Sequence, residues 1–297
     1  MARTHSALQA FGLKLRQLRE EAGLNGKQLA ERLRWQPSKL SRVENGKQTV
    51  SPEDLAEWAD GLGVSTPIRD GLLAELHDSR LEYATWKQQL AAGTFDRQHA
   101  SLRREAGATS ISVFESAIVP GLLQTPEYAR HVLTGVVQTY GTTDDVDAGV
   151  RARIERQAAL YDPTKRWRFL MTEAVLLYRL APAQIMLAQL DRLTMLAGLD
   201  SIEIRIVPFT ARYVIAPWNG CFIFDDDTIE VETISAELTI TDPAEIVLYR
   251  RVYDAMWESG LAGNPLRELL QATAEVYRID ESARSRRRKP TDTDSSR

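Results

Sequence analysis

The chain has 297 residues, a formal net charge of −4, and a hydrophobic fraction of 43%. This length exceeds what one small domain needs and leaves room for a second packed core. No apolar run reaches the roughly 18 residues of a membrane span, and residues 1–10 carry no secretory pattern. Cys221 is the single cysteine. We therefore expect a cytoplasmic protein without a membrane span.

The first predicted helix covers residues 7–22. Its apolar residues recur every three or four positions, which gathers them on one helix face; they are Leu8, Phe11, Leu15 and Leu18. Gly23 ends this helix. Asn25 is suited to begin the next one, because its side chain can accept a free backbone N–H at a helix start.

Residues 25–51 predict two short helices joined by a tight turn. The first helix has an apolar stripe formed by Leu29, Ala30 and Leu33, and the second has one formed by Leu40 and Val43. The residues between them, 34–36, suffice only for a sharp turn. Two helices joined in this way form a helix-turn-helix, whose second helix enters the major groove of DNA.

The N-terminal region resembles the helix-turn-helix domain of Cro/C1-type regulators, also called the xenobiotic-response-element type. The most characteristic match is the run Leu40-Ser-Arg-Val-Glu44 followed by Asn45-Gly46-Lys47. Gly46 stands just after the helix, where a left-handed backbone is needed. The resemblance implies an ion pair between Arg19 and Glu44 that fixes the motif to its scaffold.

The predicted recognition helix, about 37–44, supplies the candidate contacts to DNA. Side chains at its start face the groove, so Gln36, Pro37, Ser38 and Arg42 are the predicted base contacts. Arg42 lies one turn after Ser38 and can donate twice to guanine O6 and N7. The predicted phosphate contacts, mostly near helix ends, are Asn25, Lys27, Lys39, Ser41, Asn45 and Lys47.

Ser51-Pro52-Glu53-Asp54 predicts a fourth helix, with a cap, a proline at its first position and acids in its first turn. A fifth helix is expected over 67–77. The chain thus predicts an all-α helix-turn-helix domain of about five helices over 1–65. A helical connector follows over 66–107, in which Leu81, Tyr83, Trp86 and Leu90 continue an apolar helix face.

Residues 108–279 predict a larger α+β domain. Strands are indicated where apolar residues alternate with polar ones or form short runs, over 110–114, 167–171, 202–207, 221–224 and 229–234. The last two of these strands flank residues 225–228, which are typical of a hairpin turn. Helices are indicated over 144–161, 182–198, 242–259 and 263–278. Helices packed around strands that are grouped late in the chain define the α+β class.

This domain resembles a C-terminal domain of unknown function found behind such helix-turn-helix domains in actinobacterial regulators. The match is carried by Ile118-Val-Pro-Gly-Leu-Leu-Gln-Thr-Pro-Glu-Tyr-Ala-Arg130 and by Arg153-Ile-Glu-Arg-Gln157. Shorter matches are Thr172–Ala174, Val207–Phe209, Val231–Thr233 and Asp242–Glu245. The resemblance implies a regulator of development or antibiotic production, or an antitoxin-like protein. It also implies a small partner protein encoded nearby.

Charge is distributed unevenly. Residues 1–50 carry ten Lys/Arg against four Asp/Glu, whereas 51–279 carry 21 against 33. A basic N-terminal region focuses binding to double-stranded DNA at one end of the chain. The acidic middle either suits a basic partner or serves solubility. Since one recognition helix covers few base pairs, we expect a homodimer on half-sites roughly 34 Å apart.

Residues 280–297, with six Lys/Arg against four Asp/Glu, predict a disordered basic tail. No catalytic motif is recognisable, and the four histidines, His5, His77, His99 and His131, share none. We therefore expect no enzyme, cofactor or metal. Three alternatives stay open: Asp225-Asp226-Asp227 as a cation site, an enzyme with a targeting domain, and a small-molecule pocket lined by Trp218, Phe222, Phe224 and Trp257.

Overall fold

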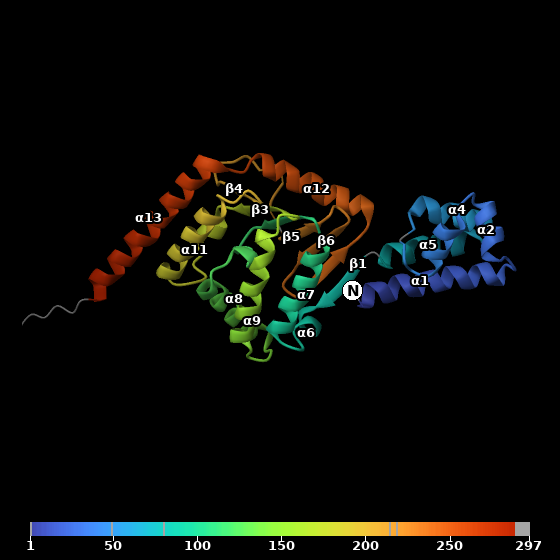
Figure 1. Cartoon of the computed structure of the whole chain (residues 1–297), viewed down its shortest axis with the longest axis horizontal. Helices are drawn as coiled ribbons and strands as arrows, with labels where there is room; N and C mark the ends of the chain where they lie inside the picture. Colours follow the sequence, from blue (N-terminus) through green and yellow to red (C-terminus); the bar gives the residue numbers. More distant parts are fainter. Residues whose placement is uncertain (1, 49, 80, 214, 218, 289–297) are drawn as a thin grey trace, which may run out of the picture. The chain divides into compact units, whose positions relative to one another are not determined.

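The computed structural model describes residues 2–48, 50–79, 81–213, 215–217 and 219–288. The chain divides into two compact units (Figure 1). The first unit runs to Tyr83 and also includes Thr239–Asp242, and the second contains the remainder. Each unit has its own hydrophobic core. Among the described residues, no helix combines the length and apolar character needed to cross a bilayer.

The first unit is built from α1 (Ala2–Glu21), α2 (Gly26–Arg32), α3 (Pro37–Glu44), α4 (Pro52–Leu62) and α5 (Thr66–Ser79). Its core is formed by apolar residues from all of these helices, including Leu15, Leu29, Leu40, Leu55, Trp58, Leu72 and Leu76. The expected all-α domain is therefore present.

Local sequence signals explain where these helices begin and end. The Asn25 side chain accepts the Gln28 N–H, while the Gln28 side chain accepts the Asn25 N–H, which forms a capping box before α2. Ser51 caps α4 and Pro52 opens it. Gly63 ends α4 with a φ of 76°, in the left-handed region that glycine adopts without steric cost.

Gly12 fixes the distance between α1 and α3. A Cβ atom at this position would lie 2.6 Å from the Val43 carbonyl oxygen and 2.8 Å from the Glu44 carbonyl oxygen. Both contacts are with backbone, which cannot swing away as a side chain can. Only glycine therefore permits α1 to pass this close to the end of α3.

A mixed sheet has the strand order β1-β7-β6-β5-β2-β3-β4, of which β2, β3, β4, β5 and β6 lie wholly in the second unit. The strands are β1 (Leu81–Thr85), β2 (Ser110–Glu115), β3 (Arg166–Thr172), β4 (Ile202–Val207), β5 (Cys221–Phe224), β6 (Thr228–Glu232) and β7 (Ala236–Ile240). β2, β3 and β4 are parallel, whereas β5 is antiparallel to both β2 and β6. The unit thus has the expected mixture of helices and strands.

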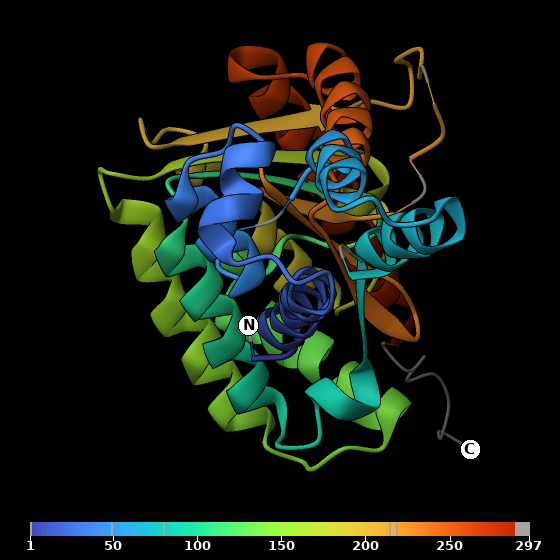
Figure 2. The ribbon, with the colours of Figure 1, turned by 90° about the vertical axis from the view of Figure 1, so that its right-hand side faces the viewer.

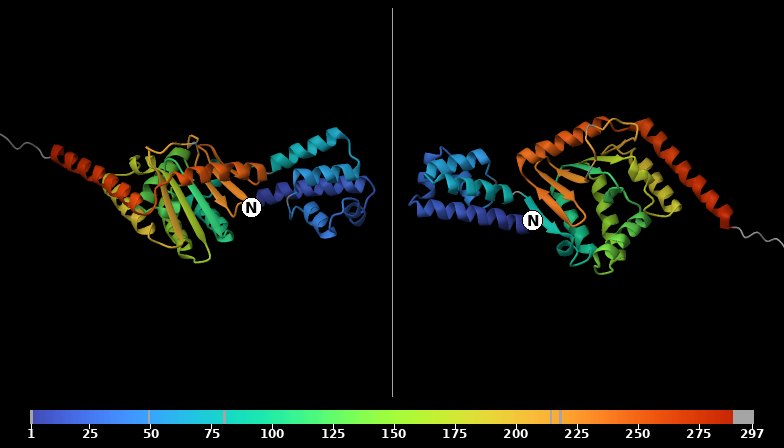
Figure 3. Two further views of the ribbon diagram at one scale, coloured as in Figure 1. Left: turned by 90° about the horizontal axis from the view of Figure 1, so that it is seen from above. Right: turned by 180° about the vertical axis from the view of Figure 1, so that it is seen from behind.

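Ten helical segments complete the second unit's described residues. They are α6 (Trp86–Gln89), α7 (Thr94–Gly107), η1 (Gly121–Leu123), α8 (Pro126–Tyr140), α9 (Val146–Arg156), η2 (Gln157–Tyr161), α10 (Ala174–Leu177), α11 (Ala183–Leu196), α12 (Pro243–Glu258) and α13 (Gly263–Arg288). α9 packs against both α7 and α8 (Figure 2), and α11 packs against α13 (Figure 3).

The two faces of the sheet meet different helices. Trp167, Phe169 and Met171 on β3 are buried in the main core of the unit. Arg168, between them in sequence, lies on the opposite face because side chains alternate along a strand. Its backbone carbonyl accepts a hydrogen bond from Tyr253 of α12, at 3.0 Å. α12 therefore covers the face away from that core.

Several elements differ from those expected. Residues 81–90 form β1 and α6, whereas their apolar spacing predicts the continuation of a helix face, and the sequence predicts no strand at the position of β7. The expected connector, 66–107, is divided: α5 contributes Leu72 and Leu76 to the first unit's core, whereas α7 packs on α9 in the second. α13 continues to Arg288, into the segment predicted as a disordered tail. Residues 289–297 lie outside the described residues.

Candidate functional site

α3 has one face turned into the first unit and one face turned to solvent. Leu40, Val43 and Glu44 are buried. The predicted base-contact residues, Gln36, Pro37, Ser38 and Arg42, are all exposed. Pro37 occupies the first turn, where its missing N–H removes no helix hydrogen bond. The helix thus presents polar side chains outward from a core that holds its other face.

A buried ion pair fastens α3 to α1. Arg19 donates from Nε to Glu44 Oε1 at 2.7 Å and from Nη2 to Glu44 Oε2 at 2.9 Å. Its Nη1 donates to the Leu24 carbonyl oxygen at 2.8 Å. The hydrogen bonds to Glu44 raise the pKa of Arg19 above its usual value. The resemblance implied this ion pair, and its two-point geometry fixes the orientation as well as the position of α3.

Arg42 is exposed near the end of α3 and is oriented by a neighbour. Its Nε donates to Gln48 Oε1 at 2.9 Å, and both side chains are exposed. Gln48 was not among the predicted residues, and no local pattern marks it, because it stands after the helix. Among the described residues Nε alone has a hydrogen-bond partner, which leaves both terminal nitrogens of Arg42 able to donate to another acceptor.

The three lysines among the predicted phosphate contacts differ in whether their ammonium groups already have partners among the described residues. Lys27 and Lys47 are exposed. Lys39 instead pairs with Asp54 at 2.8 Å, and its ammonium lies 4.0 Å from the ring centroid of Trp35. A phosphate would therefore have to compete with Asp54 for Lys39.

The three uncharged phosphate candidates make local hydrogen bonds. The Asn25 side chain caps α2, and Asn45 Nδ2 donates to the Ser41 carbonyl oxygen at 2.6 Å. The Asn25 bond holds the start of α2, where backbone N–H groups are unpaired, whereas the Asn45 bond holds the end of α3. Asn25, Ser41 and Asn45 nevertheless all remain exposed.

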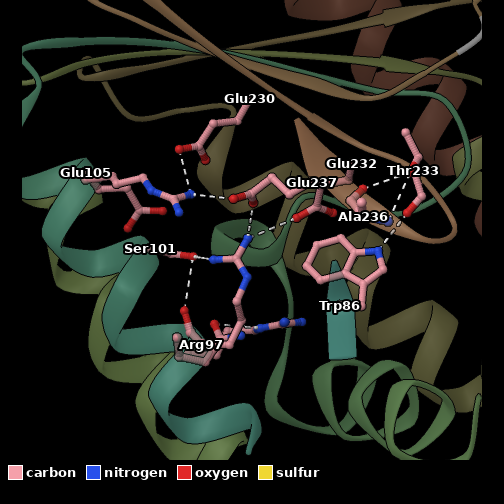
Figure 4. Close-up of polar contacts among 12 residues, drawn as sticks. Trp86, Arg97, Ser101, Glu105, Glu230, Glu232, Thr233, Ala236 and Glu237 are labelled. Carbon is pink, nitrogen blue, oxygen red and sulfur yellow. Dashed lines mark hydrogen bonds and ion pairs between the residues drawn. The ribbon is translucent and has the colours of Figure 1, made fainter. Parts of the chain in front are cut away.

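The second unit contains a buried cluster of charges between α7 and the sheet (Figure 4). Arg97 of α7 pairs with Glu237 of β7, and Arg104 pairs with both Glu230 and Glu237. Arg156 of α9 forms a two-point pair with Glu105. Burial is the main cause that raises the pKa of Glu230 to about 7, opposed by Arg104.

This cluster predicts a pH-dependent stability. A carboxyl whose folded-state pKa of about 7 exceeds its ordinary value of 4.5 holds its proton more tightly in the folded state. The stability that Glu230 contributes is therefore complete below about pH 4.5 and is lost as the pH rises through about 7. Urea unfolding between pH 4 and 8 measures this, with Glu230→Gln expected to flatten the decline. An unchanged pH profile in Glu230→Gln would contradict the assignment.

The remaining candidates of the second unit are dispersed. Cys221 is buried in β5, and burial raises the pKa of its thiol to about 12, so it stays protonated and is a poor nucleophile. His99 contacts the Phe95 ring and His131 bonds the Glu127 carbonyl. The side chains of His5 and His77 lie outside the described residues. Within the described ranges, no three His, Cys, Asp or Glu residues could hold a metal ion.

Asp225, one of the three consecutive aspartates, accepts hydrogen bonds from the backbone N–H groups of Thr109 and Ser110. Asp225 and Asp226 both have positive φ, at 46° and 61°, as tight hairpin turns require. The geometry therefore fits a β5–β6 turn that is tied to β2.

The expected pocket residues separate into two groups. Phe222 and Phe224 line a cavity of about 260 Å³ inside the second unit. Trp257 instead belongs to α12, and its ring centroid lies 4.1 Å from the Arg168 guanidinium and 4.6 Å from the Arg205 guanidinium. Trp218 lies outside the described residues. The cavity's polar residues come from several distant elements, so no local pattern marks them.

Comparisons with known families identify both units. Residues 98–272 match the domain of unknown function DUF5753, and residues 10–72 match a helix-turn-helix domain. The chain is also similar to the HTH-type transcriptional repressor RghR of Bacillus subtilis (strain 168), with 34% identity over 82 residues. That alignment spans 26% of this chain and 61% of the relative, less than two thirds of its length.

Similarities to solved structures are weak. Nuc, a phospholipase D family member from Salmonella typhimurium, gives a TM-score of 0.34 at 11% identity, covering 62% of this chain and 97% of that one. NucT from Helicobacter pylori gives 0.34 at 10% identity with the same coverage. The archaeal chromatin protein TrmBL2 gives 0.31 at 12% identity, covering 71% and 66%. Scores this low carry no argument about function.

Proposed function

The chain belongs to the family defined by the domain of unknown function DUF5753, here joined to a helix-turn-helix DNA-binding domain, and on that premise we propose that it is a sequence-specific transcriptional regulator. The observation that carries the proposal is the exposed polar face of α3, held from behind by the Arg19–Glu44 pair. The similarity to a transcriptional repressor supports a regulatory role.

In this proposal α3 enters the major groove. Gln36, Pro37, Ser38 and Arg42 contact base edges, while the residues near the helix ends contact phosphates. The phosphate set comprises Asn25, Lys27, Lys39, Ser41, Asn45 and Lys47. Arg42 carries most of the sequence information, because its planar fork matches the two acceptors of guanine.

Arg42→Ala should weaken binding to a selected operator by about 1–3 kcal/mol and relax the preference at one base pair. The physical reason is the loss of a two-point hydrogen bond to guanine. Fluorescence anisotropy with the operator, its single-base variants and random DNA measures both effects.

Lys47→Ala is the matched control, since it removes an exposed charge of the same sign from the same motif. It should lower the affinity for all DNA sequences alike. It should also reduce the slope of log affinity against log salt concentration by about 1. If Arg42→Ala left the ratio of operator to random affinity unchanged, the assignment of Arg42 to base recognition would be wrong.

We also propose that the protein acts as a homodimer. One recognition helix spans few base pairs, so two copies on half-sites roughly 34 Å apart would supply the needed specificity. Sedimentation equilibrium of the full chain, with and without a palindromic operator, tests this. A monomer that binds a single half-site in both conditions would contradict it.

For the second unit, we propose binding to a small basic partner protein encoded next to this gene, as in the antitoxin-like actinobacterial regulators that the chain resembles. The second unit itself is acidic, because residues 84–279 carry 25 Asp/Glu against 19 Lys/Arg, and this excess supports a basic partner. Co-expression and co-purification with the product of the adjacent gene, at several salt concentrations, tests the proposal. No complex at any salt concentration would count against it.

The alternative is a regulator whose second unit senses a small molecule. One specific observation favours it, namely the cavity of about 260 Å³ inside that unit. A ligand that changes the affinity of the full chain for its operator would distinguish this alternative from the partner proposal.

A further inference from the structure

The cavity of the second unit lies between the sheet and the helices α7, α8 and α9. We call it the body cavity. Its volume of about 260 Å³ exceeds the roughly 150 Å³ of an engineered protein cavity that holds benzene. A ligand with one ring or one branched chain and two small polar groups is therefore the size that fits.

One part of the body cavity is apolar. Phe169, Phe222 and Phe224 contribute aromatic rings from the sheet, and Val132 and Val136 contribute aliphatic groups from α8. The rings of Phe222 and Phe224 are stacked, with centroids 6.3 Å apart. A ligand buried here gains from the removal of its own apolar surface from water.

The other part is polar, and most of its charges are already paired. Arg97 pairs with Glu237, and Arg156 pairs with Glu105. Glu230 pairs with Arg104. Two ionisable side chains that line the cavity have no partner of opposite charge within the described part of the chain. These are Arg153 of α9 and Glu115 of β2.

In the described part of the chain, the side chain of Arg153 is hydrogen-bonded to neutral groups alone. Its Nε donates to Gln98 Oε1 at 3.3 Å and its Nη1 donates to Gln124 Oε1 at 2.6 Å. Burial and the nearby Arg156 lower the pKa of Arg153 to about 9. Amide oxygens orient the guanidinium but do not neutralise it, so a bound anion would relieve the cost of its burial.

Glu115 has the opposite charge to Arg153 when ionised, and it is less well satisfied. No hydrogen bond or ion pair joins its carboxyl to any described residue. Burial and the negative charge of Glu232 raise its pKa well above the usual value. Glu232 also lines the cavity. A cation between these two carboxyls would remove their repulsion and favour the ionised form of Glu115.

From this arrangement we propose that the body cavity binds a small zwitterion of the amino-acid type. Its carboxylate pairs with Arg153, its ammonium lies between Glu115 and Glu232, and its apolar side chain packs on Phe222 and Phe224. This inference rests on the ligand-sensing alternative above and names its ligand class. Binding is measured without DNA, so its failure is distinguishable from failure of operator recognition.

The cavity also involves the segment that follows the unit boundary at Tyr83. Trp86 lines the cavity, and its indole N–H donates to the Thr233 carbonyl oxygen at 2.7 Å. Arg97, which pairs with Glu232 at 3.4 Å, lies 5.6 Å from the Trp86 ring. Arg97 therefore links Glu232, at the proposed ammonium site, to Trp86 near the start of the second unit (Figure 4).

The test uses the full-length protein and matched probes in thermal-shift and calorimetric titrations. The zwitterions are L-leucine, L-phenylalanine and L-tryptophan. N-acetyl-L-phenylalanine lacks the ammonium, and phenethylamine lacks the carboxylate. At least one zwitterion should raise the melting temperature and bind at least tenfold more tightly than the corresponding single-charge analogue. No shift with any zwitterion at 10 mM, or equal binding of the analogues, would overturn the proposal.

Two variants locate the site. Arg153→Gln should abolish the preference for molecules with a carboxylate, whereas Arg151→Gln, an exposed arginine on the same helix, should leave it unchanged. If Arg153→Gln fails to fold, Val136→Trp replaces it as the test. This variant fills the cavity without removing a charge, so it should abolish binding of the zwitterion. Full binding by a folded Val136→Trp would overturn the proposal. Operator affinity measured without ligand should be the same in all folded variants.

Discussion

Glu44→Ala is expected to destabilise the first unit by about 3–5 kcal/mol, because it leaves the guanidinium of Arg19 buried without a counter-charge. Arg19 and Glu44 are 6% and 5% exposed, so water cannot replace the lost carboxylate. This cost approaches the whole stability of a small domain. Differential scanning calorimetry of the full chain should show that the unfolding transition of the first unit is absent or shifted to a much lower temperature. Operator binding should be lost at every temperature at which the first unit is unfolded.

Glu20→Ala is the matched control for this prediction. Glu20 contacts the same guanidinium at 3.4 Å, but its side chain is 56% exposed. An exposed partner contributes about 0–1 kcal/mol, so this variant should keep both the transition and DNA binding. If Glu20→Ala and Glu44→Ala lowered the stability of the first unit by the same amount, burial of the Arg19–Glu44 pair would not be what stabilises α3.

Glu237→Ala is expected to destabilise the second unit by a similar amount, about 3–5 kcal/mol. Its side chain is 2% exposed and its carboxylate pairs with both Arg97 and Arg104. One substitution therefore removes an ion-pair partner from two guanidinium groups. Urea unfolding followed by tryptophan fluorescence measures the change.

Glu232→Ala is the comparison, because Glu232 pairs with the same Arg97 yet is 43% exposed. Its loss should change the free energy of unfolding by about 0–1 kcal/mol. A Glu237→Ala variant no less stable than Glu232→Ala would indicate that Arg97 and Arg104 find other partners.

The first unit was largely predictable because its signals are local. Asn25 and Ser51 mark helix starts, and glycines mark helix ends, within a few residues of the features they specify. The outward face of α3 follows from the apolar positions Leu40 and Val43 alone. The contact between Arg42 and Gln48 did not follow, since it depends on how the chain turns after the helix.

The second unit was less predictable because its pairings are distant in sequence. β1 was mistaken for helix, since its apolar spacing fits either structure and its place in the sheet depends on β7, about 150 residues later. The cavity shows the same limit. The segments 118–130 and 153–157 carry the family resemblance. The hydrogen bond between Gln124 in the first segment and Arg153 in the second forms only in the folded chain, so the sequence does not reveal it.

Gly12 has a consequence for how such a protein can acquire new targets. The backbone of α1 and the end of α3 are locked together by a contact that tolerates no side chain. The residues that fasten the helix are thus different from those that face the groove. If Gln36, Ser38 and Arg42 contact bases as proposed, exchanging any one of them would alter the recognised sequence without loosening the scaffold. New operators would then be reached through single changes that the fold tolerates.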